Sequence, residues 1–281
     1  MAQKHKVRDA HVCLEATGRY GEVVAIYLHA RGYAVSVVNP ARQDARVIAH
    51  FCATQTPKLW TSPTPVVQEL QALSCRLKTL KINRTRELNR QQSGLTSETV
   101  LAAIAAHIAF LDEQITTIEQ RMRDLINQDP ELRQQYELLL SIPDIGNITA
   151  ANFLAEVPDI TRFDSASQLA AYAGLTPRRH ESGSSIHLRR RLVKAGNVHF
   201  RTAFFMPALV AMRYNPIIKA LVVRLEARGK CRMSIVGATM RKLVHLAFGV
   251  LKHQQPFDPD YLVNLQVVSW LSTWYLRGIF S

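Results

Sequence analysis

Two patterns of hydrophobic residues follow one another along this chain, and the first occupies its N-terminal part. Residues 10–14 and 33–38 are short apolar runs, and residues 20–29 between them carry a helical pattern. A strand, a helix and a strand at this spacing predict a βαβ unit with two parallel neighbouring strands. A further helix is expected over residues 46–52. A proline-containing linker follows it.

The second pattern is a long run in which leucine, isoleucine and valine recur every three or four residues. It covers Val66 to Leu80 and then, after a break at Ser93-Gly94, Leu101 to Leu125. Such a seam predicts two long helices. They would form either an antiparallel hairpin or a coiled-coil dimer arm. Arg84, Arg86 and Arg90 on the first helix either contact nucleic acid or are simply solvated.

The C-terminal part is predicted to be helical throughout. Helices are expected over residues 163–172, 198–212, 217–228 and 234–253, with Asn215-Pro216 and Gly229 as stops. The predicted fold class is therefore mixed but mainly α. We divide the chain into an α/β unit (1–55), a linker (56–64), a helical hairpin (65–130), an all-α domain (131–260) and an apolar tail (261–281).

Composition and charge narrow the possible partners. The chain has 281 residues, 47% of them apolar, and a net charge of +13. An excess of arginine spread over several segments favours a polyanion such as nucleic acid. Cys13, Cys52, Cys75 and Cys231 have no zinc-site spacing and are interpreted as reduced thiols of a cytoplasmic protein. We find no signal peptide, and no uninterrupted apolar run of ~20 residues that would cross a membrane.

The candidate chemistry lies between Gly174 and Lys194. Ser182-Gly183-Ser184-Ser185 stands between Arg178-Arg179 and Arg189-Arg190-Arg191. Arginine forks pair with phosphate oxygens, and a hydroxyl can attack phosphorus. From the spacing alone, an ordinary solvated loop is the better interpretation, because no base or metal ligand is adjacent in sequence.

A family resemblance changes this interpretation. The segments Gly174-Leu175-Thr176-Pro177-Arg178-Arg179, Glu181-Ser182-Gly183-Ser184-Ser185 and Lys194-Ala195-Gly196-Asn197, followed by Arg201, resemble the DEDD insertion-sequence transposases of the family numbered one hundred and ten. Its better-studied members are recombinases guided by a bridge RNA. The resemblance implies that Ser182 is the nucleophile that becomes joined to DNA. It covers the chain from about His11 to Tyr261.

The same resemblance implies the other residues of the site. Leu14-Glu15-Ala16-Thr17-Gly18 matches the family's second acidic motif, and Asp44-Ala45-Arg46 matches the end of its third. Glu15 and Asp44 would be catalytic ligands of Mg²⁺ in a partial ribonuclease-H- or RuvC-like domain. The cationic residues expected to contact nucleic acid are Arg178, Arg179, Arg189, Arg190, Arg191, Lys194, Arg201, Lys230, Arg241 and Lys242.

Two of the family's four carboxylates have no counterpart here. The first acidic strand precedes Met1 in relatives, and Arg42-Gln43 runs directly into Asp44. We therefore expect a copy truncated at its N-terminus and internally deleted. A two-ion site needs several oxygen ligands around ions roughly 4 Å apart. Two carboxylates are too few, so impaired activity is expected.

One more motif concerns DNA contact. Residues 138–150 resemble a helix-hairpin-helix, in which a tight turn presents backbone N–H groups to a phosphate. Asp144 stands where the first glycine usually is, which puts a negative charge at the turn and removes a residue suited to positive φ. DNA contact and a purely structural turn both stay open.

The implied function is transposition, with DNA, a bridge RNA and a second copy of the chain as partners. The second copy would bind through the coiled coil. The alternative is a non-catalytic RNA- or DNA-binding remnant, or a partner of an intact transposase.

Overall fold

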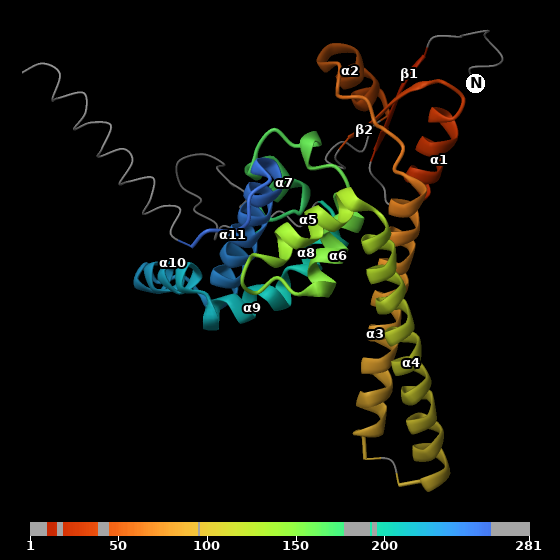
Figure 1. The fold of residues 1–281 in the computed structure, drawn as a ribbon, viewed down its shortest axis with the longest axis vertical. Coiled ribbons are helices and arrows are strands. Elements are labelled where there is room, and N and C mark those ends of the chain that lie inside the picture. The colour runs from red at the N-terminus through yellow and green to blue at the C-terminus, as the bar shows by residue number, and fades with distance from the viewer. Residues whose placement is uncertain are drawn as a thin grey trace, which may run out of the picture.

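The described part of the chain begins with a small parallel sheet. The computed structural model describes residues 10–15, 19–38, 45–94, 96–176, 192 and 196–259, which are mainly helical (Figure 1). Strands β1 (His11–Glu15) and β2 (Ala34–Val38) flank helix α1 (Arg19–His29). His11 pairs with Ala34 and Glu15 with Val38, in parallel register. The predicted βαβ unit is confirmed.

The segment predicted to be a linker lies against this sheet. Helix α2 (Ala45–Gln55) packs on β1 and places the Cys52 Sγ 3.4 Å from the His11 Nδ1. Beyond α2, the Trp60 backbone N–H donates to the Val35 carbonyl at 2.6 Å. Trp60 is only 7% exposed and completes a small core with Ala25 and Val35. Residues 56–64 are irregular, as expected, but their tryptophan fixes them to β2.

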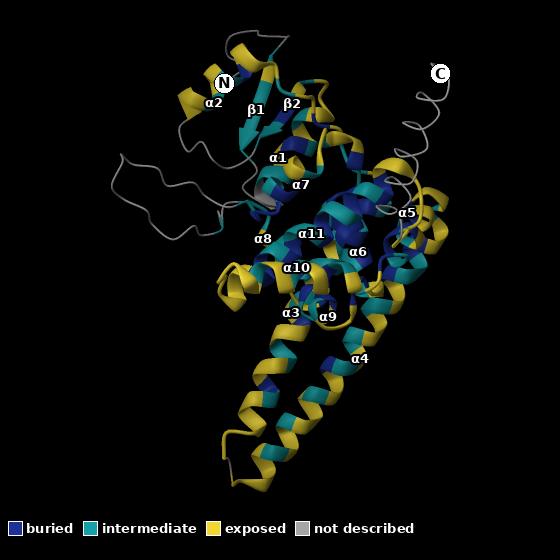
Figure 2. Ribbon diagram, turned by 90° about the vertical axis from the view of Figure 1, so that its left-hand side faces the viewer, coloured by how far each residue is buried: buried dark blue, intermediate teal, exposed yellow. Residues whose placement is uncertain are grey.

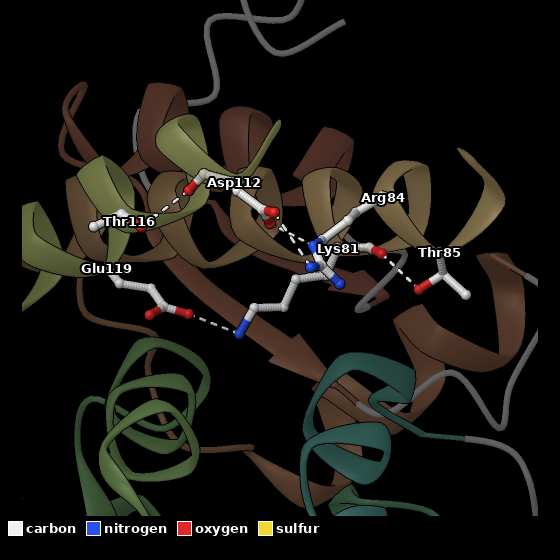
Figure 3. A network of polar contacts seen from close by, with 6 residues as sticks. All are labelled: Lys81, Arg84, Thr85, Asp112, Thr116 and Glu119. Carbon is white, nitrogen blue, oxygen red and sulfur yellow. Dashed lines mark hydrogen bonds and ion pairs between the residues drawn. The ribbon is translucent and has the colours of Figure 1, made fainter. Parts of the chain in front are cut away.

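The leucine-rich run forms two antiparallel helices, α3 (Pro65–Gln91) and α4 (Glu98–Gln128), which project from the molecule as an arm (Figure 1). Ion pairs join Glu69 to Arg121 at 2.8 Å and Lys81 to Glu119 at 2.7 Å. Arg84 pairs with Asp112 beside them (Figure 3). Along these pairs the residue number on α3 rises while that of its partner on α4 falls, so the two helices are antiparallel. The hydrophobic seam therefore lies between two helices of one chain. The predicted antiparallel hairpin is confirmed, while a coiled-coil dimer arm stays a prediction.

The remaining described residues form a helical domain at the base of the hairpin. Its elements are α5 (Pro130–Leu140), α6 (Asn147–Glu156), the 3₁₀ turn η2 (Ile160–Arg162), α7 (Ala166–Tyr172), α8 (Val198–Ala203), α9 (Phe205–Tyr214), α10 (Pro216–Ala227) and α11 (Arg232–His253). The single helix predicted over 198–212 is wrong, because it breaks at Phe204. The break accompanies burial of Phe200 and Phe204, whose rings lie 5.1 and 6.1 Å from that of Phe153.

Helix α11 forms the centre of this domain. It packs against α5, α7, α9 and α10, and Figure 2 shows it buried along most of its length. By length and mean hydropathy alone, α4 (1.2) and α11 (1.3) could cross a membrane, as could α8–α9 with α10 across an 88° bend. The sequence expectation, based on uninterrupted runs, missed these helices. In α11 61% of the apolar window is buried within the protein, against 6% in α4.

The turn between α5 and α6 is hydrogen-bonded to the start of α10. Asp144 adopts a φ of 79°, so the positive φ that was expected to need glycine is present at an aspartate. The Asn215 Nδ2 donates to the Asp144 Oδ2 at 3.0 Å. The Asn215 Oδ1 caps α10 by accepting from the backbone N–H groups of Ile217 and Ile218 at 3.0 and 3.2 Å.

Replacing this buried asparagine is expected to destabilise the domain. Asn215→Ala removes the cap of α10 and leaves the Asp144 carboxylate without its amide donor. We expect a loss of about 1–3 kcal/mol in the free energy of unfolding, measured by urea titration. Asn89→Ala, at an exposed position of α3, is the control and should change stability little. Equal stability of the two variants would contradict the role of Asn215.

Candidate functional site

Most of the predicted site residues lie outside the described part of the chain. These are Ser182, Asp44, the cations Arg178, Arg179, Arg189, Arg190, Arg191 and Lys194, and the tail 261–281. The residues between Thr176 and Gly196 carry Ser182, and we call them the serine segment. The structure describes Thr176 at one end and Gly196 at the other. The described part of the predicted site consists of Glu15 and the cations Arg201, Lys230, Arg241 and Lys242.

The two ends of the serine segment meet closely. Gly196 has a φ of +133°, and a Cβ added to it would lie 2.5 Å from the Tyr172 carbonyl oxygen and 2.8 Å from the Gly174 nitrogen. The next residue, Asn197, donates its backbone N–H to the Tyr172 carbonyl at 2.7 Å. Only glycine fits this approach and this φ. We call the contacting residues the loop anchor: Tyr172, Ala173, Gly174, Gly196, Asn197 and Arg201.

Asn197 is the polar centre of the loop anchor. Its Nδ2 donates to the Glu156 Oε2 at 2.6 Å and to the Tyr172 hydroxyl at 2.8 Å. Its Oδ1 accepts from the Phe200 N–H at 2.9 Å and so caps α8. One side chain therefore joins α6, the end of α7 and the start of α8. A shorter or apolar side chain would leave all three groups without this partner.

The phenol of Tyr172 is held neutral within this arrangement. Burial raises the pKa of Tyr172, the hydrogen bond from Asn197 lowers it, and the carboxylates of Glu156 and Glu22 raise it. The hydroxyl therefore stays protonated at neutral pH. Glu22 belongs to α1, so the α/β unit contributes charge at the loop anchor. The linker contributes a further contact with the helical domain, because Lys58 pairs with Asp164 at 2.6 Å.

Two arginines that the sequence assigned to nucleic acid contact the protein backbone around the loop anchor. The Arg201 Nη1 donates to the Ala173 carbonyl at 3.1 Å. The Arg241 Nη1 lies 3.4 Å from both the Leu175 carbonyl and the Thr176 Oγ1. Both hold the irregular residues that lead into the serine segment. Their nucleic-acid role stays a prediction, as it does for the exposed Lys230 and the half-buried Lys242.

Helix α11 also contacts a described residue of the serine segment. Leu192, described within the serine segment, packs on Gly237, where an added Cβ would lie 2.8 Å from the leucine Cδ1. One turn beyond Arg241, burial lowers the pKa of His245, and the charges of Arg241 and Lys242 lower it further. His245 is therefore neutral at pH 7. Sequence reasoning missed the anchoring roles of Glu156, Tyr172 and Asn197, although the Gly196-Asn197 pair was the available signal.

Glu15 lies at the edge of the sheet where both strands end. It is half-buried and pairs in register with Val38. Helix α2 starts at Ala45, directly after Asp44, and brings Cys52 back to His11 at the opposite end of β1. The Glu15 carboxylate is a ligand type that suits a hard cation such as Mg²⁺, whereas Asp44, its predicted partner, lies outside the described residues. Among the described residues, no three His, Cys, Asp or Glu side chains gather as a metal site.

The four cysteines are all described and all free. Cys13 lies beside Cys52. Burial is the main cause that raises the pKa of Cys13 to about 11, and the neighbouring Cys52 thiol adds to the rise. The Cys13 thiol is therefore protonated at neutral pH and is a poor nucleophile. The free state of all four agrees with their interpretation as reduced thiols.

Comparisons with known proteins place the anchor in a family. A family model described as "Transposase IS116/IS110/IS902 family" matches residues 136–223, which include the loop anchor. The pilin gene-inverting protein of Moraxella bovis is 33% identical over 275 residues, covering 92% of this chain and 84% of the relative. The chain belongs to the IS116/IS110/IS902 family of transposases.

Other relatives carry insertion-sequence names. The transposase for insertion sequence element IS1111A of Coxiella burnetii is 26% identical over 264 residues, covering 82% of this chain and 71% of the relative. A 43.6 kDa protein of insertion element IS110 from Streptomyces coelicolor is 31% identical over 157 residues, covering 56% of this chain and 38% of the relative. The family assignment thus agrees with the resemblance carried by the motifs around Ser182 and Gly196.

The close approach at Gly196 generates a test of the loop anchor. Gly196→Ala puts a methyl group against two backbone atoms and forces a φ that alanine rarely adopts. The φ alone should cost about 1–3 kcal/mol of stability, and the overlap should add to it. Gly229→Ala is the matched control, since it has a positive φ of +66° and no atom within 4 Å of the added Cβ.

Thermal or urea unfolding measures both variants. Gly196→Ala should be the less stable of the two by a clear margin. If the two glycine variants lose the same stability, the close approach between residues 172–174 and 196 does not restrict the chain.

Proposed function

We propose that this transposase cleaves and rejoins DNA strands through Ser182. The observation that carries the proposal is the similarity, over 92% of this chain, to a protein named for inverting a pilin gene. Inverting a DNA segment requires strands to be cut and joined to new partners. A serine that attacks phosphorus conserves the energy of the broken bond in a covalent protein–DNA link.

The proposed step uses groups around the serine segment. The Ser182 Oγ forms a bond to phosphorus, the bond from phosphorus to one deoxyribose oxygen breaks, and the serine proton ends on that oxygen. Arg178 and Arg179 would pair with the non-bridging phosphate oxygens as the charge builds. The loop anchor supports this role, because it fixes both ends of the segment that carries these residues.

Glu15 and Asp44 are the proposed holders of Mg²⁺. When bound, the ion would stabilise negative charge on the phosphate oxygens. Glu15 ends β1, and we assign the sheet to a partial RuvC-like domain. Two carboxylates are fewer than a two-ion site uses, so we propose that the rate of cleavage by this chain is low.

The turn between α5 and α6 is assigned a structural role within the proposed helix-hairpin-helix. The Asp144 carboxylate would repel a phosphate, and its bond to Asn215 joins the turn to α10 instead. DNA and a bridge RNA are the proposed nucleic-acid partners, and the cytoplasm is the proposed location. The basic charge of +13 supports the choice of polyanionic partners.

We also propose that two copies associate through the hairpin. Helix α4 is apolar, yet only 6% of its apolar window is buried, and Phe110 is 53% exposed. A second hairpin could cover this face in the manner of a coiled coil.

Replacing the proposed nucleophile tests the chemistry. The full chain is incubated with Mg²⁺ and labelled DNA carrying the junctions that flank its own gene. Denaturing gels should show a covalent protein–DNA adduct, and Ser182→Ala should abolish it. Ser184→Ala, two residues away along the chain, is the matched control and should keep the adduct.

The same assay tests the metal site. Glu15→Gln should remove the Mg²⁺-dependent adduct, whereas Glu98→Gln, exposed at the start of α4, should not. An adduct that survives Ser182→Ala would refute the serine as nucleophile. Absence of an adduct with the unchanged chain, together with intact DNA binding, would favour the non-catalytic binder.

Association through the hairpin is tested by its exposed phenylalanine. Phe110→Glu places a charge on the apolar face of α4 and should convert a dimer into a monomer, as measured by light scattering after size-exclusion chromatography. Phe205→Glu on α9, where the phenylalanine is 38% exposed, is the control and should stay dimeric. Identical masses for the two variants would place the association elsewhere.

A further inference from the structure

An open groove of about 700 Å³ lies where α9, α10 and α11 meet, outside the loop anchor. Arg213 and Tyr214 reach it from the last turn of α9, and Arg232 and Ile235 from the first turn of α11. Lys230 stands in the short connection between α10 and α11. The groove is completed by Leu209, Val210, Met212, Val222 and Glu226.

The cations of this groove have no acidic partner in the described part of the chain. Arg213, Lys230 and Arg232 are exposed, and no ion pair is found for any of them among the described residues. The hairpin differs, because Arg84 and Arg121 there are each neutralised by a carboxylate across the seam. Residues 213–232 hold six arginine and lysine residues and one acid, Glu226. The groove therefore concentrates unpaired positive charge.

The floor of the same groove is apolar and includes an exposed aromatic ring. Tyr214 is 65% exposed and Val210 is 42% exposed, while Ile235 lines the base of the groove and is only 2% exposed. Phosphates alone would need the cations but not this apolar surface. Unpaired bases offer both features, since their rings stack on aromatic side chains while their backbone pairs with arginine and lysine. In a duplex the ring faces are already stacked on neighbouring bases.

We propose that this groove binds an unpaired nucleic-acid strand, with Tyr214 stacking on a base and Arg213, Lys230 and Arg232 pairing with the adjoining phosphates. The site goes beyond the proposed strand cleavage and does not depend on it, because binding needs neither Ser182 nor Mg²⁺. The proposal also gives a function to the 88° bend between α9 and α10. The bend creates the angle in which the groove lies.

The test measures binding of the full chain to labelled oligonucleotides by fluorescence anisotropy at several salt concentrations. The probes are a mixed-sequence 12-mer of DNA, the same sequence in RNA, and the 12-mer DNA duplex. Lys230→Ala/Arg232→Ala should weaken single-strand binding and reduce the salt slope by roughly 1.4, about 0.7 for each phosphate contact. Tyr214→Ala should weaken single-strand binding by about tenfold and duplex binding much less.

A matched double variant separates the groove from general charge. Arg76→Ala/Lys252→Ala removes the same charge from exposed positions on α3 and at the end of α11, and should leave single-strand affinity near that of the unchanged chain. Unfolding midpoints confirm that each variant is folded. The DNA and RNA arms show which strand the groove prefers, and binding of either one supports the proposal.

Three results would overturn the proposal. The first is an equal loss in the Lys230/Arg232 and Arg76/Lys252 variants, which would reduce the effect to net charge. The second is single-strand affinity that does not change in Tyr214→Ala. The third is a polyglutamate peptide that competes as well as the oligonucleotides, which would identify the groove as a site for acidic protein segments. Loss of the Ser182 adduct has no bearing on these outcomes.

Discussion

An apolar helix at the centre of a domain must be covered on all sides, and this requirement organises the C-terminal half of the chain. Helix α11 buries residues on most of its turns, from Ile235 to Leu251. Helices α5, α7, α9 and α10 supply the cover. The cover also brings distant segments of the chain together. Arg241 reaches the carbonyl of Leu175, and Gly237 leaves room for Leu192.

The loop anchor follows from this packing. Once α7 and α8 are both held against neighbouring helices, the chain between them must leave and return at nearly the same place. Gly196 allows the return because it has no side chain to collide with the Tyr172 carbonyl and the Gly174 nitrogen. Asn197 then satisfies polar groups on α6, α7 and α8. A long functional segment can thus begin and end on rigid elements.

The elements could largely be predicted from the sequence, because hydrophobic period reports local structure. The βαβ unit, the two long helices and the order of the C-terminal helices were all found in this way. The break at Phe204 was missed, since helical propensity continues across it and only packing against Phe153 accompanies the break. Trp60 was missed for a similar reason. Its docking on β2 depends on a backbone hydrogen bond to Val35, which no local pattern encodes.

The candidate site was less predictable than the fold, because side-chain partners are set by tertiary contact. Arg201 and Arg241 look like phosphate ligands in a basic sequence, yet their guanidinium groups hold backbone carbonyls. Arg84 looks similar and is paired with Asp112. Asp144 reads as an obstacle to the turn that it occupies with a φ of 79°.

Positive charge therefore has three different uses in this chain. In the hairpin it closes a seam between two helices, at the loop anchor it fixes the backbone, and at the groove between α9, α10 and α11 it has no described acidic partner. Charge already engaged by carbonyls or carboxylates can contribute little to a polyanion, because binding would first have to break those contacts. Net charge indicates the class of partner. The unpaired fraction of that charge, which only the fold determines, indicates where the partner binds.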